Sequence, residues 1–196
     1  IMTAITPLEF IHKKGIFGDH QKKNESDLLK ISEVKNLSII QIVQYKKSKI
    51  NIKDIKIEDL EIPTQSSKIN SNKGTRILWS APRTWLILTN KENVIETVEK
   101  SFKEKDFAIT DISHSRALIQ IQGDQAKEIL KKGSPINFNE FGVNQCAGTV
   151  FHGITIIIDS ISNEPDTFNL LVLRSFGESF YHHITDSALE FGYVGV

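Results

Sequence analysis

The chain has 196 residues, of which 39% are hydrophobic, so it is long enough and apolar enough to bury a core. Its 24 Lys and Arg residues balance its 24 Asp and Glu residues. This balance argues against nucleic acid and anionic membranes as partners, because the chain carries no overall field that would attract either of them.

The chain contains a single cysteine, Cys146, which has no second cysteine to pair with. This usage is typical of a reducing compartment. The first ten residues lack the apolar segment of a signal peptide, and no apolar run is long enough to span a membrane. We therefore expect a cytoplasmic protein.

Alternating apolar residues bounded by turn residues predict β-strands along most of the chain. The segment from Tyr45 to Gly74 is ambiguous, because its isoleucines fit a broken strand and a short helix about equally well. Within it, residues 65–74 indicate a loop. The predicted strands cover residues 37–43, 76–79, 85–89, 116–122, 150–159 and 168–173.

Helical spacing of apolar residues predicts three helices, which follow the strands. Asn90 is predicted to cap the first helix and Asp124 the second, because their side chains can accept hydrogen bonds from free helical N–H groups. Gly133 and Gly192 are predicted to end the second and third helices. The apolar stripes lie within residues 94–102, 124–132 and about 178–191.

An internal similarity organises these elements, since the turn and strand at residues 82–88 are echoed at residues 165–171. The order strand, helix, strand, strand, helix occurs twice, which predicts an α+β fold with mostly antiparallel sheet. Gene duplication and chance similarity both account for the echo. We expect one domain over residues 1–196, with repeated lobes at about 30–105 and 106–196.

The histidines do not predict a metal site. None lies at ligand spacing, and the adjacent His182 and His183 would point about 100° apart on a helix. Glycine-rich phosphate loops are also missing from the sequence. We therefore expect no metal and no nucleotide cofactor to be bound by this chain.

A cluster of Asp111, Ser113 and His114 brings together the residue types of a nucleophilic triad. Triad members converge from separate elements, however, with the serine on a strained turn, and the G-x-S-x-G motif is missing. Asp and Ser in a tight turn more often bind local backbone amides. The turn role is therefore favoured, and we predict no catalytic residue.

Two groups of residues are candidates for a partner interface. Trp79 and Trp85 flank a turn, and tryptophan is enriched among residues that dominate interfaces, although core packing is the favoured role for each. Arg174, Ser175 and Phe176 lie where a strand leads into the last helix. There, free amides and the guanidinium could bind an anion or a partner carboxylate, or Ser175 could simply cap the helix.

The motifs together resemble one family, the gamma subunit of heterotetrameric sarcosine oxidase, over essentially the whole chain. Arg83 and Thr84 depart from it, because the family usually has acidic residues after Pro82. The segments that carry the resemblance are Thr6-Pro7-Leu8, residues 79–86, Thr110-Asp111-Ile112-Ser113 before Gly123-Asp124-Gln125-Ala126, Leu173-Arg174-Ser175-Phe176 and Glu190-Phe191-Gly192.

The resemblance implies a distant relationship to the folate-binding domain of aminomethyltransferases, a duplicated α+β lobe. That domain carries its catalytic carboxylate in a glycine-glycine-x-x-aspartate-aspartate segment. Residues 151–156 of this chain, Phe-His-Gly-Ile-Thr-Ile, stand in its place without a carboxylate. One-carbon transfer needs such a group to manage the proton, so the resemblance implies a non-catalytic lobe.

The resemblance also implies a complex that oxidises sarcosine to glycine and hydrogen peroxide, with the one-carbon unit captured by tetrahydrofolate. FAD, FMN, NAD, tetrahydrofolate and zinc are expected in partner subunits of the alpha, beta and delta types, and this chain is expected to pack against the large flavin-bearing ones. Two alternatives stay open at this point. One is a free-standing folate-binding or aminomethyltransferase-like protein, and the other is a module of a related oxidase that acts on an amine such as dimethylglycine.

Overall fold

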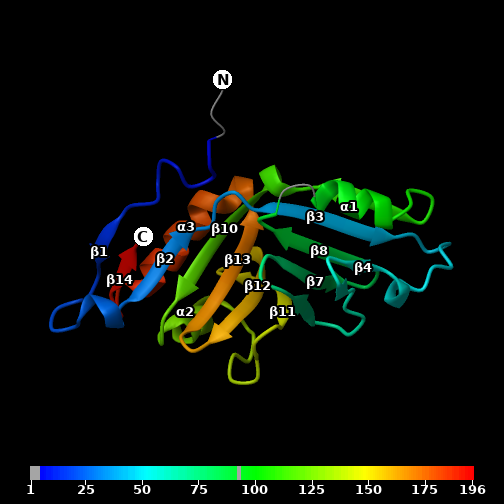
Figure 1. Ribbon diagram of the computed structural model, residues 1–196. Helices are drawn as coiled ribbons and strands as arrows, with labels where there is room; N and C mark the ends of the chain where they lie inside the picture. Colours follow the sequence, from blue (N-terminus) through cyan, green and yellow to red (C-terminus); the bar gives the residue numbers. More distant parts are fainter. Residues whose placement is uncertain (1–4, 92–93) are drawn as a thin grey trace. The chain divides into compact units, whose positions relative to one another are not determined.

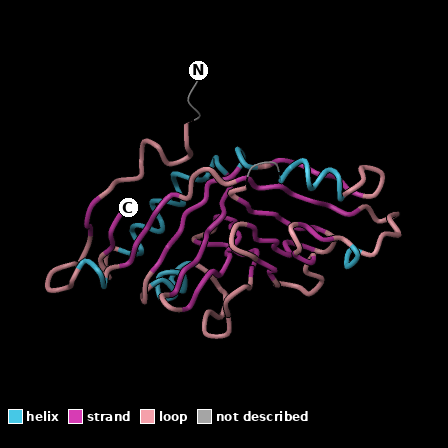
Figure 2. Tube along the Cα trace, in the orientation of Figure 1, coloured by secondary structure: helices cyan, strands magenta, loops and turns pink. Residues whose placement is uncertain are grey.

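The computed structural model describes residues 5–91 and 94–196, and strands make up most of its regular structure (Figure 2). The chain divides into two compact units. The first contains Ile1–Lys35, Ser115–Val143 and Gly148–Val196, and the second contains Asn36–His114 and Asn144–Ala147. The N-terminal 35 residues therefore group with the C-terminal part of the chain, whereas the sequence suggested lobes starting at about 30 and 106. The duplication itself stays a prediction.

The first unit is built on a seven-stranded sheet with the order β1-β14-β2-β10-β13-β12-β11 (Figure 1). β2 pairs antiparallel with β10, β10 with β13, and β13 with β12, whereas β14 runs parallel to β2. The strands are β1 (Gly15–Phe17), β2 (Leu29–Glu33), β10 (Arg116–Gln122), β11 (Cys146–Phe151), β12 (Ile154–Asn163), β13 (Asp166–Leu173) and β14 (Tyr193–Gly195).

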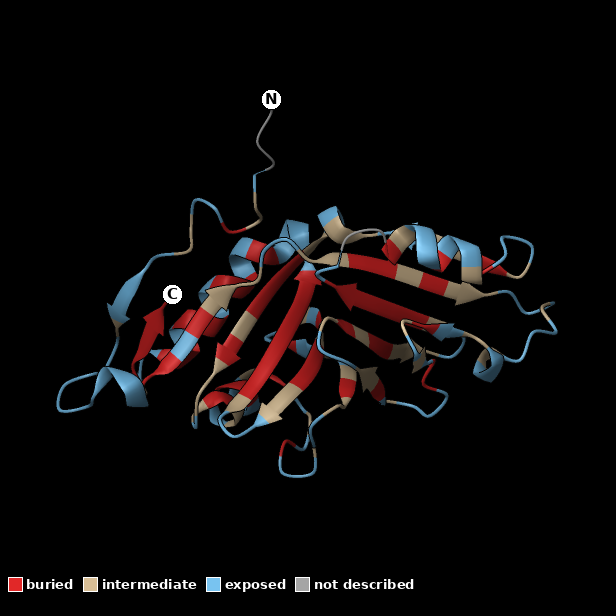
Figure 3. Cartoon of the chain, in the orientation of Figure 1, coloured by how far each residue is buried: buried red, intermediate tan, exposed pale blue. Residues whose placement is uncertain are grey.

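Two helices, α2 (Ala126–Gly133) and α3 (Gly177–Ala188), pack against each other and against this sheet. Alternate residues of β10 and β13, such as Ile119 and Leu170, face them and are fully buried (Figure 3). From the helices, Ile129 and Phe180 complete the core. Each such side chain contributes about 1.5–3 kcal/mol when it is removed from water, so this layer is the main source of stability.

The second unit is a five-stranded sheet with the order β6-β7-β8-β3-β9, covered by α1 (Val94–Ser101) and a small hairpin of β4 and β5. Val98 of α1 packs with Ile42 and Ile87 of the sheet. The strands are β3 (Ser38–Gln44), β4 (Lys56–Ile57), β5 (Leu60–Glu61), β6 (Ile69–Ser71), β7 (Thr75–Ala81), β8 (Thr84–Thr89) and β9 (Phe107–Asp111).

Short 3-10 turns connect several of these elements. They are η1 (Glu25–Asp27), η2 (Ile52–Asp54), η3 (Ser113–Ser115) and η4 (Arg174–Phe176). The ambiguous segment after Tyr45 thus contains both a helical turn, η2, and the short strands β4 and β5. Residues 65–74 are not entirely a loop, because β6 lies within them.

The α+β class and the antiparallel strands at 37–43, 76–79, 85–89, 116–122 and 168–173 are confirmed. The single strand predicted over 150–159 is wrong. The chain turns back at His152 and Gly153, which have φ angles of 45° and 83°, and so forms the two strands β11 and β12. The apolar run continued across a turn that requires left-handed backbone, and alternation alone did not reveal it.

The helix ends also differ from the predictions. Gln125, not Asp124, is the N-cap of α2, and Gly133 is the last helical residue, followed by an extended Ser134. α3 ends at Ala188, before Gly192. Gly192 has a φ angle of 71°, and a Cβ atom there would lie 2.6 Å from the carbonyl oxygen of Asp19, so only glycine fits this close approach. The start of the first helix, predicted from Asn90, falls on residues 92–93, outside the described residues.

Candidate interaction surface

The N-terminal segment of the first unit, residues 5–12, is held by the side chain of Glu33 at the end of β2. Glu33 Oε1 accepts a hydrogen bond from the backbone N–H of Leu8 at 3.0 Å, and Oε2 accepts one from Thr6 Oγ1 at 2.8 Å. The Glu33 side chain is only 2% exposed, and Lys35 Nζ lies 3.6 Å from it. Hydrogen bonds to a charged group away from water are stronger than neutral ones, so Glu33 fixes the path of this segment.

His12 ties the other end of this segment to the C-terminal part of the chain. One ring nitrogen, Nδ1, lies 3.0 Å from the hydroxyl of Tyr181 on α3, and Nε2 lies 2.7 Å from the carbonyl oxygen of Val196. Leu8 is fully buried between these two anchors. The segment therefore follows α3 as a strap with fixed contacts at both ends.

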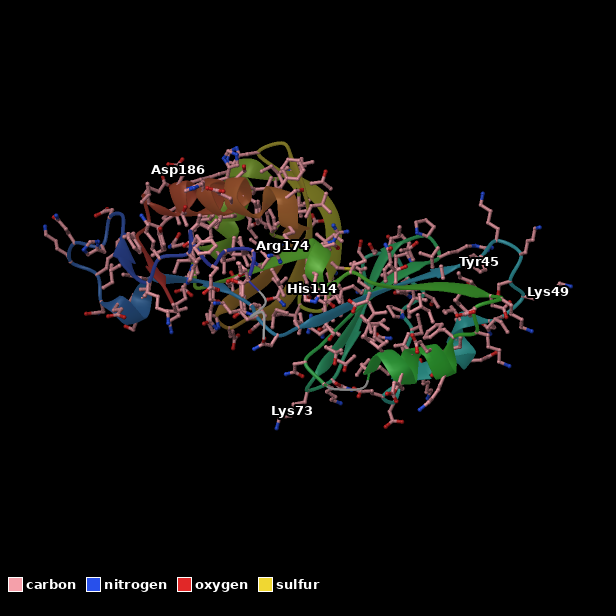
Figure 4. All side chains as sticks on the ribbon, turned by 90° about the horizontal axis from the view of Figure 1, so that it is seen from above. Tyr45, Lys49, Lys73, His114, Arg174 and Asp186 are labelled. Atoms are coloured by element: carbon pink, nitrogen blue, oxygen red, sulfur yellow. The ribbon has the colours of Figure 1, made fainter. Side chains whose placement is uncertain are left out.

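The turn η4 carries Arg174, Ser175 and Phe176 to the start of α3, next to the strap (Figure 4). Arg174 Nη2 donates a hydrogen bond to the carbonyl oxygen of Ile5 at 2.6 Å. A Cβ atom at Gly177 would lie 3.2 Å from the Ala117 side chain, so the absence of a side chain brings the helix start close to the sheet. The predicted serine cap is not formed, because Phe176 is the N-cap of α3 and no side chain bonds there.

Large apolar side chains are left exposed along this strap and turn. Phe10 is 84% exposed and Ile5 56%, and the neighbouring Phe176 and Leu173 are 48% and 43% exposed. The segments that carry them lie side by side, because Ile5 contacts Arg174, Leu8 lies near Gly177 and His12 contacts Tyr181. We call Ile5, Phe10, Leu173 and Phe176 the apolar strip. Grouped exposed apolar side chains of this kind mark interaction surfaces.

The two tryptophans lie in the second unit, opposite each other on β7 and β8. Trp85 is buried in the core, and its Nε1–H donates to the carbonyl oxygen of Pro63 at 2.7 Å. Trp79 is half-buried against the same core, and its carbonyl oxygen accepts a hydrogen bond from Cys146 Sγ at 3.1 Å. Trp85 thus fills a core position, which leaves little of its surface for a partner.

Asp111 and Ser113 are turn residues in the structure. Asp111 Oδ1 accepts hydrogen bonds from the N–H and the hydroxyl of Ser113, at 2.9 and 2.5 Å. The same hydroxyl oxygen accepts from the N–H of Ile39 at 2.9 Å. The Ser113 hydrogen bonds lower the pKa of Asp111, against a smaller desolvation effect that raises it. This pair therefore ties the end of β9 to β3.

Several histidines contact aromatic rings or carboxylates in the structure. The rings of His152 and His183 lie 5.2 Å apart, and His182 Nε2 lies 4.0 Å from Glu178 on the same helix. Across residues 5–91 and 94–196, no group of three or more His, Cys, Asp or Glu side chains is arranged to hold a metal ion. Within the same ranges, no helix has the length and apolarity needed to cross a bilayer.

Comparison with solved structures defines the class of fold. The chain superimposes on the glycine cleavage system aminomethyltransferase T of Bartonella henselae with a TM-score of 0.59 and 12% identity, over 80% of this chain and 45% of that one. It therefore has an aminomethyltransferase-like α+β fold.

The family is defined by sequence. Residues 53–190 match the profile described as "Sarcosine oxidase, gamma subunit family". The chain belongs to this family.

Two relatives come from Corynebacterium sp. U-96. The chain is 28% identical to its "Sarcosine oxidase subunit gamma" over 122 residues, which are 60% of this chain and 58% of that relative, so the alignment covers little more than half of its length. A chain of the heterotetrameric sarcosine oxidase from the same organism, in complex with pyrrole 2-carboxylate, has the same fold, with a TM-score of 0.79 and 18% identity over 96% of both chains.

Proposed function

We propose that this chain is a non-catalytic structural subunit of a cytoplasmic, heterotetrameric sarcosine oxidase. The complex would oxidise sarcosine to glycine with release of hydrogen peroxide and formation of methylene-tetrahydrofolate. FAD, FMN, NAD, tetrahydrofolate and zinc would be bound by the alpha, beta and delta subunits. In this assignment, this chain would pack against the large flavin-bearing subunits and stabilise their arrangement.

The observation that carries the proposal is the family match over residues 53–190. The fold agrees with it along nearly the whole chain, since 96% of this chain superimposes on a chain of a heterotetrameric oxidase. The non-catalytic role is supported by residues 151–156, which have no carboxylate and contain the hairpin turn at His152 and Gly153 between β11 and β12. Phe151 of this turn is buried, and the N–H of His152 donates to the carbonyl oxygen of Gly133.

We assign the partner contact to the apolar strip and to η4, that is, to Arg174, Ser175 and Phe176. Apolar side chains surrounding an arginine are typical of the centre of a protein interface. Arg174 keeps further donors beyond the one that bonds Ile5, and they could bind a partner carboxylate. Trp79 and Trp85 are assigned to the core of the second unit.

The test is native mass spectrometry of the chain purified with a mild tag from its own cells, combined with an absorbance scan. We expect co-elution with a large and a medium subunit and flavin bands at about 370 and 450 nm. A lone, colourless species of 22.2 kDa that binds tetrahydrofolate would overturn the proposal in favour of a free-standing folate-binding protein.

The apolar strip can be tested in the same purification. Phe10→Ser and Phe176→Ser should each release the partner subunits, because they remove exposed apolar contacts without altering the core. Ile50→Ser is the matched control, since Ile50 is 41% exposed but is not part of the apolar strip. If all three variants retain the partners equally, the strip is not the contact.

A further inference from the structure

β9 is the last strand of the five-stranded sheet, and its outer edge has no paired neighbour among the described strands. At one end of the β3–β9 ladder, Tyr45 N–H donates to the carbonyl oxygen of Asp106, and at the other end Ile112 N–H donates to that of Ile39. Hydrogen-bonded pairs alternate in an antiparallel ladder. Ala108 and Thr110 therefore bond to β3, whereas the N–H and C=O groups of Ile109 and Asp111 point off the open edge.

A groove of about 670 Å³ follows this edge, next to α1. Its lining comes from β9, from Glu99 of α1 and from the turn that joins them. Tyr45, which directly follows β3, also lines it and is 43% exposed (Figure 4). The groove is lined by Tyr45, Glu99, Phe102, Glu104, Phe107, Ala108 and Ile109.

The charges of this groove are one-sided. Glu99 and Glu104 line it, whereas the lysines of the adjacent turn, Lys103 and Lys105, do not, and no other cation of the described residues does. β9 itself has the sequence Phe-Ala-Ile-Thr-Asp, without the lysine or proline that commonly protects an exposed edge. An open edge beside an acidic groove is suited to an extended segment that carries a cation.

We propose that an extended segment of a partner subunit adds to β9 as a sixth strand of this sheet, with a Lys or Arg near Glu99 and Glu104. This inference rests on the proposed function, because it takes the partner from the oxidase complex. A second copy of this chain fits less well, since pairing β9 with β9 would bring two acidic grooves together.

The test is hydrogen exchange, resolved to single amides, on the complex from its own cells and on the chain expressed alone. The N–H groups of Ile109 and Asp111 should exchange about tenfold or more slowly in the complex, because strand addition protects them. Those of Ala108 and Thr110 should be protected in both samples. Equal exchange of Ile109 in an intact complex overturns this inference and leaves the proposed function standing. If the chain purifies without partner subunits, the proposed function itself is overturned. If the Ile109 and Asp111 amides are protected in a homodimer, the added strand comes from a second copy of this chain and not from a partner subunit.

Two pairs of variants give an independent test. Ile109→Pro removes an outward N–H but no bond to β3, so it should weaken partner binding about tenfold, whereas Ile109→Val should not. Glu104→Lys should weaken binding, and the same change at the exposed Glu140 of the first unit should not. Equal binding by both members of each pair overturns the proposal. Should Ile109→Pro fail to fold, the exchange of the wild-type complex decides.

Discussion

The carboxylate of Glu33 accepts a hydrogen bond of 3.0 Å from the backbone N–H of Leu8, which lies 25 residues earlier in the chain. The same carboxylate accepts the hydroxyl of Thr6. One nearly buried side chain therefore satisfies two donors of a segment that forms no sheet or helix there, and it holds the strap that carries the apolar strip.

Glu33→Ala should lower the free energy of unfolding by about 2 kcal/mol, because the Leu8 N–H and the Thr6 hydroxyl lose a charged acceptor. Urea denaturation measures the change, and faster proteolysis within residues 5–12 would report the freed strap. Glu9→Ala is the control, with an expected loss below about 0.5 kcal/mol, since Glu9 makes only an exposed ion pair with Lys35 and an exposed hydrogen bond from Thr6, and does not accept from the Leu8 N–H. Equal losses in the two variants would refute the anchoring role of Glu33.

Ser113→Ala should cost about 1–2 kcal/mol, because the N–H of Ile39 loses its acceptor and Asp111 loses a donor. It should also change the acid sensitivity. The pKa of Asp111 is lowered in the folded chain, so its ionised carboxylate stabilises the fold. This contribution to the free energy of unfolding is present above the ordinary pKa of 3.8 and is lost as the pH falls below it. Urea midpoints between pH 2 and 6 should show a shallower acid decline in the variant. An unchanged decline would contradict this assignment.

Trp85→Phe should destabilise the second unit by about 2 kcal/mol, because the carbonyl oxygen of Pro63 loses its donor and the core loses packed atoms. Trp79→Phe is the matched comparison, and its half-buried side chain should cost less. Thermal or urea unfolding, followed by the fluorescence of the remaining tryptophan, measures both. A larger loss for Trp79→Phe would reverse the assignment of Trp85 to the core.

The stability of the first unit should fall at alkaline pH. Burial raises the pKa of Tyr181 and Tyr193, and the charge on Tyr181 raises that of Tyr193 further. Above the ordinary tyrosine value of 10.0, the unfolded chain therefore releases these protons before the folded chain does. Tyr193→Phe should make the free energy of unfolding fall less steeply between pH 9 and 11. Tyr45→Phe, at an exposed position, should not change this slope. Identical declines would exclude Tyr193 as the cause.

The predictable parts of the fold are those with a strong local period. Residues 116–122 alternate cleanly, and Val94 and Val98 lie one helical turn apart, so β10 and α1 were evident. β1 and β14 were missed because each is only three residues long. Such strands are defined by the partners they meet, which a local pattern does not contain.

The candidate interaction surface was only partly predictable. Arg174 and Phe176 lie in the turn before the last helix, as their position between strand and helix indicated. Phe10 was missed, because an apolar residue in the sequence reads first as core. Its exposure follows from the distant contacts of Leu8 and His12, which decide the direction of the strap. Family resemblance pointed to the complex, whereas the exposure of this aromatic side chain is evident only in the folded structure.

The place of β14 between β1 and β2 has a consequence for biosynthesis. Among the described strands, β1 joins the sheet through Tyr193–Gly195, which follow it much later in the chain. At a synthesis rate of roughly 5–20 residues per second, β1 leaves the ribosome tens of seconds or so before its partner strand exists. The first unit can therefore complete its sheet only after β14 has been synthesised, and until then β1 has no strand partner among the described residues.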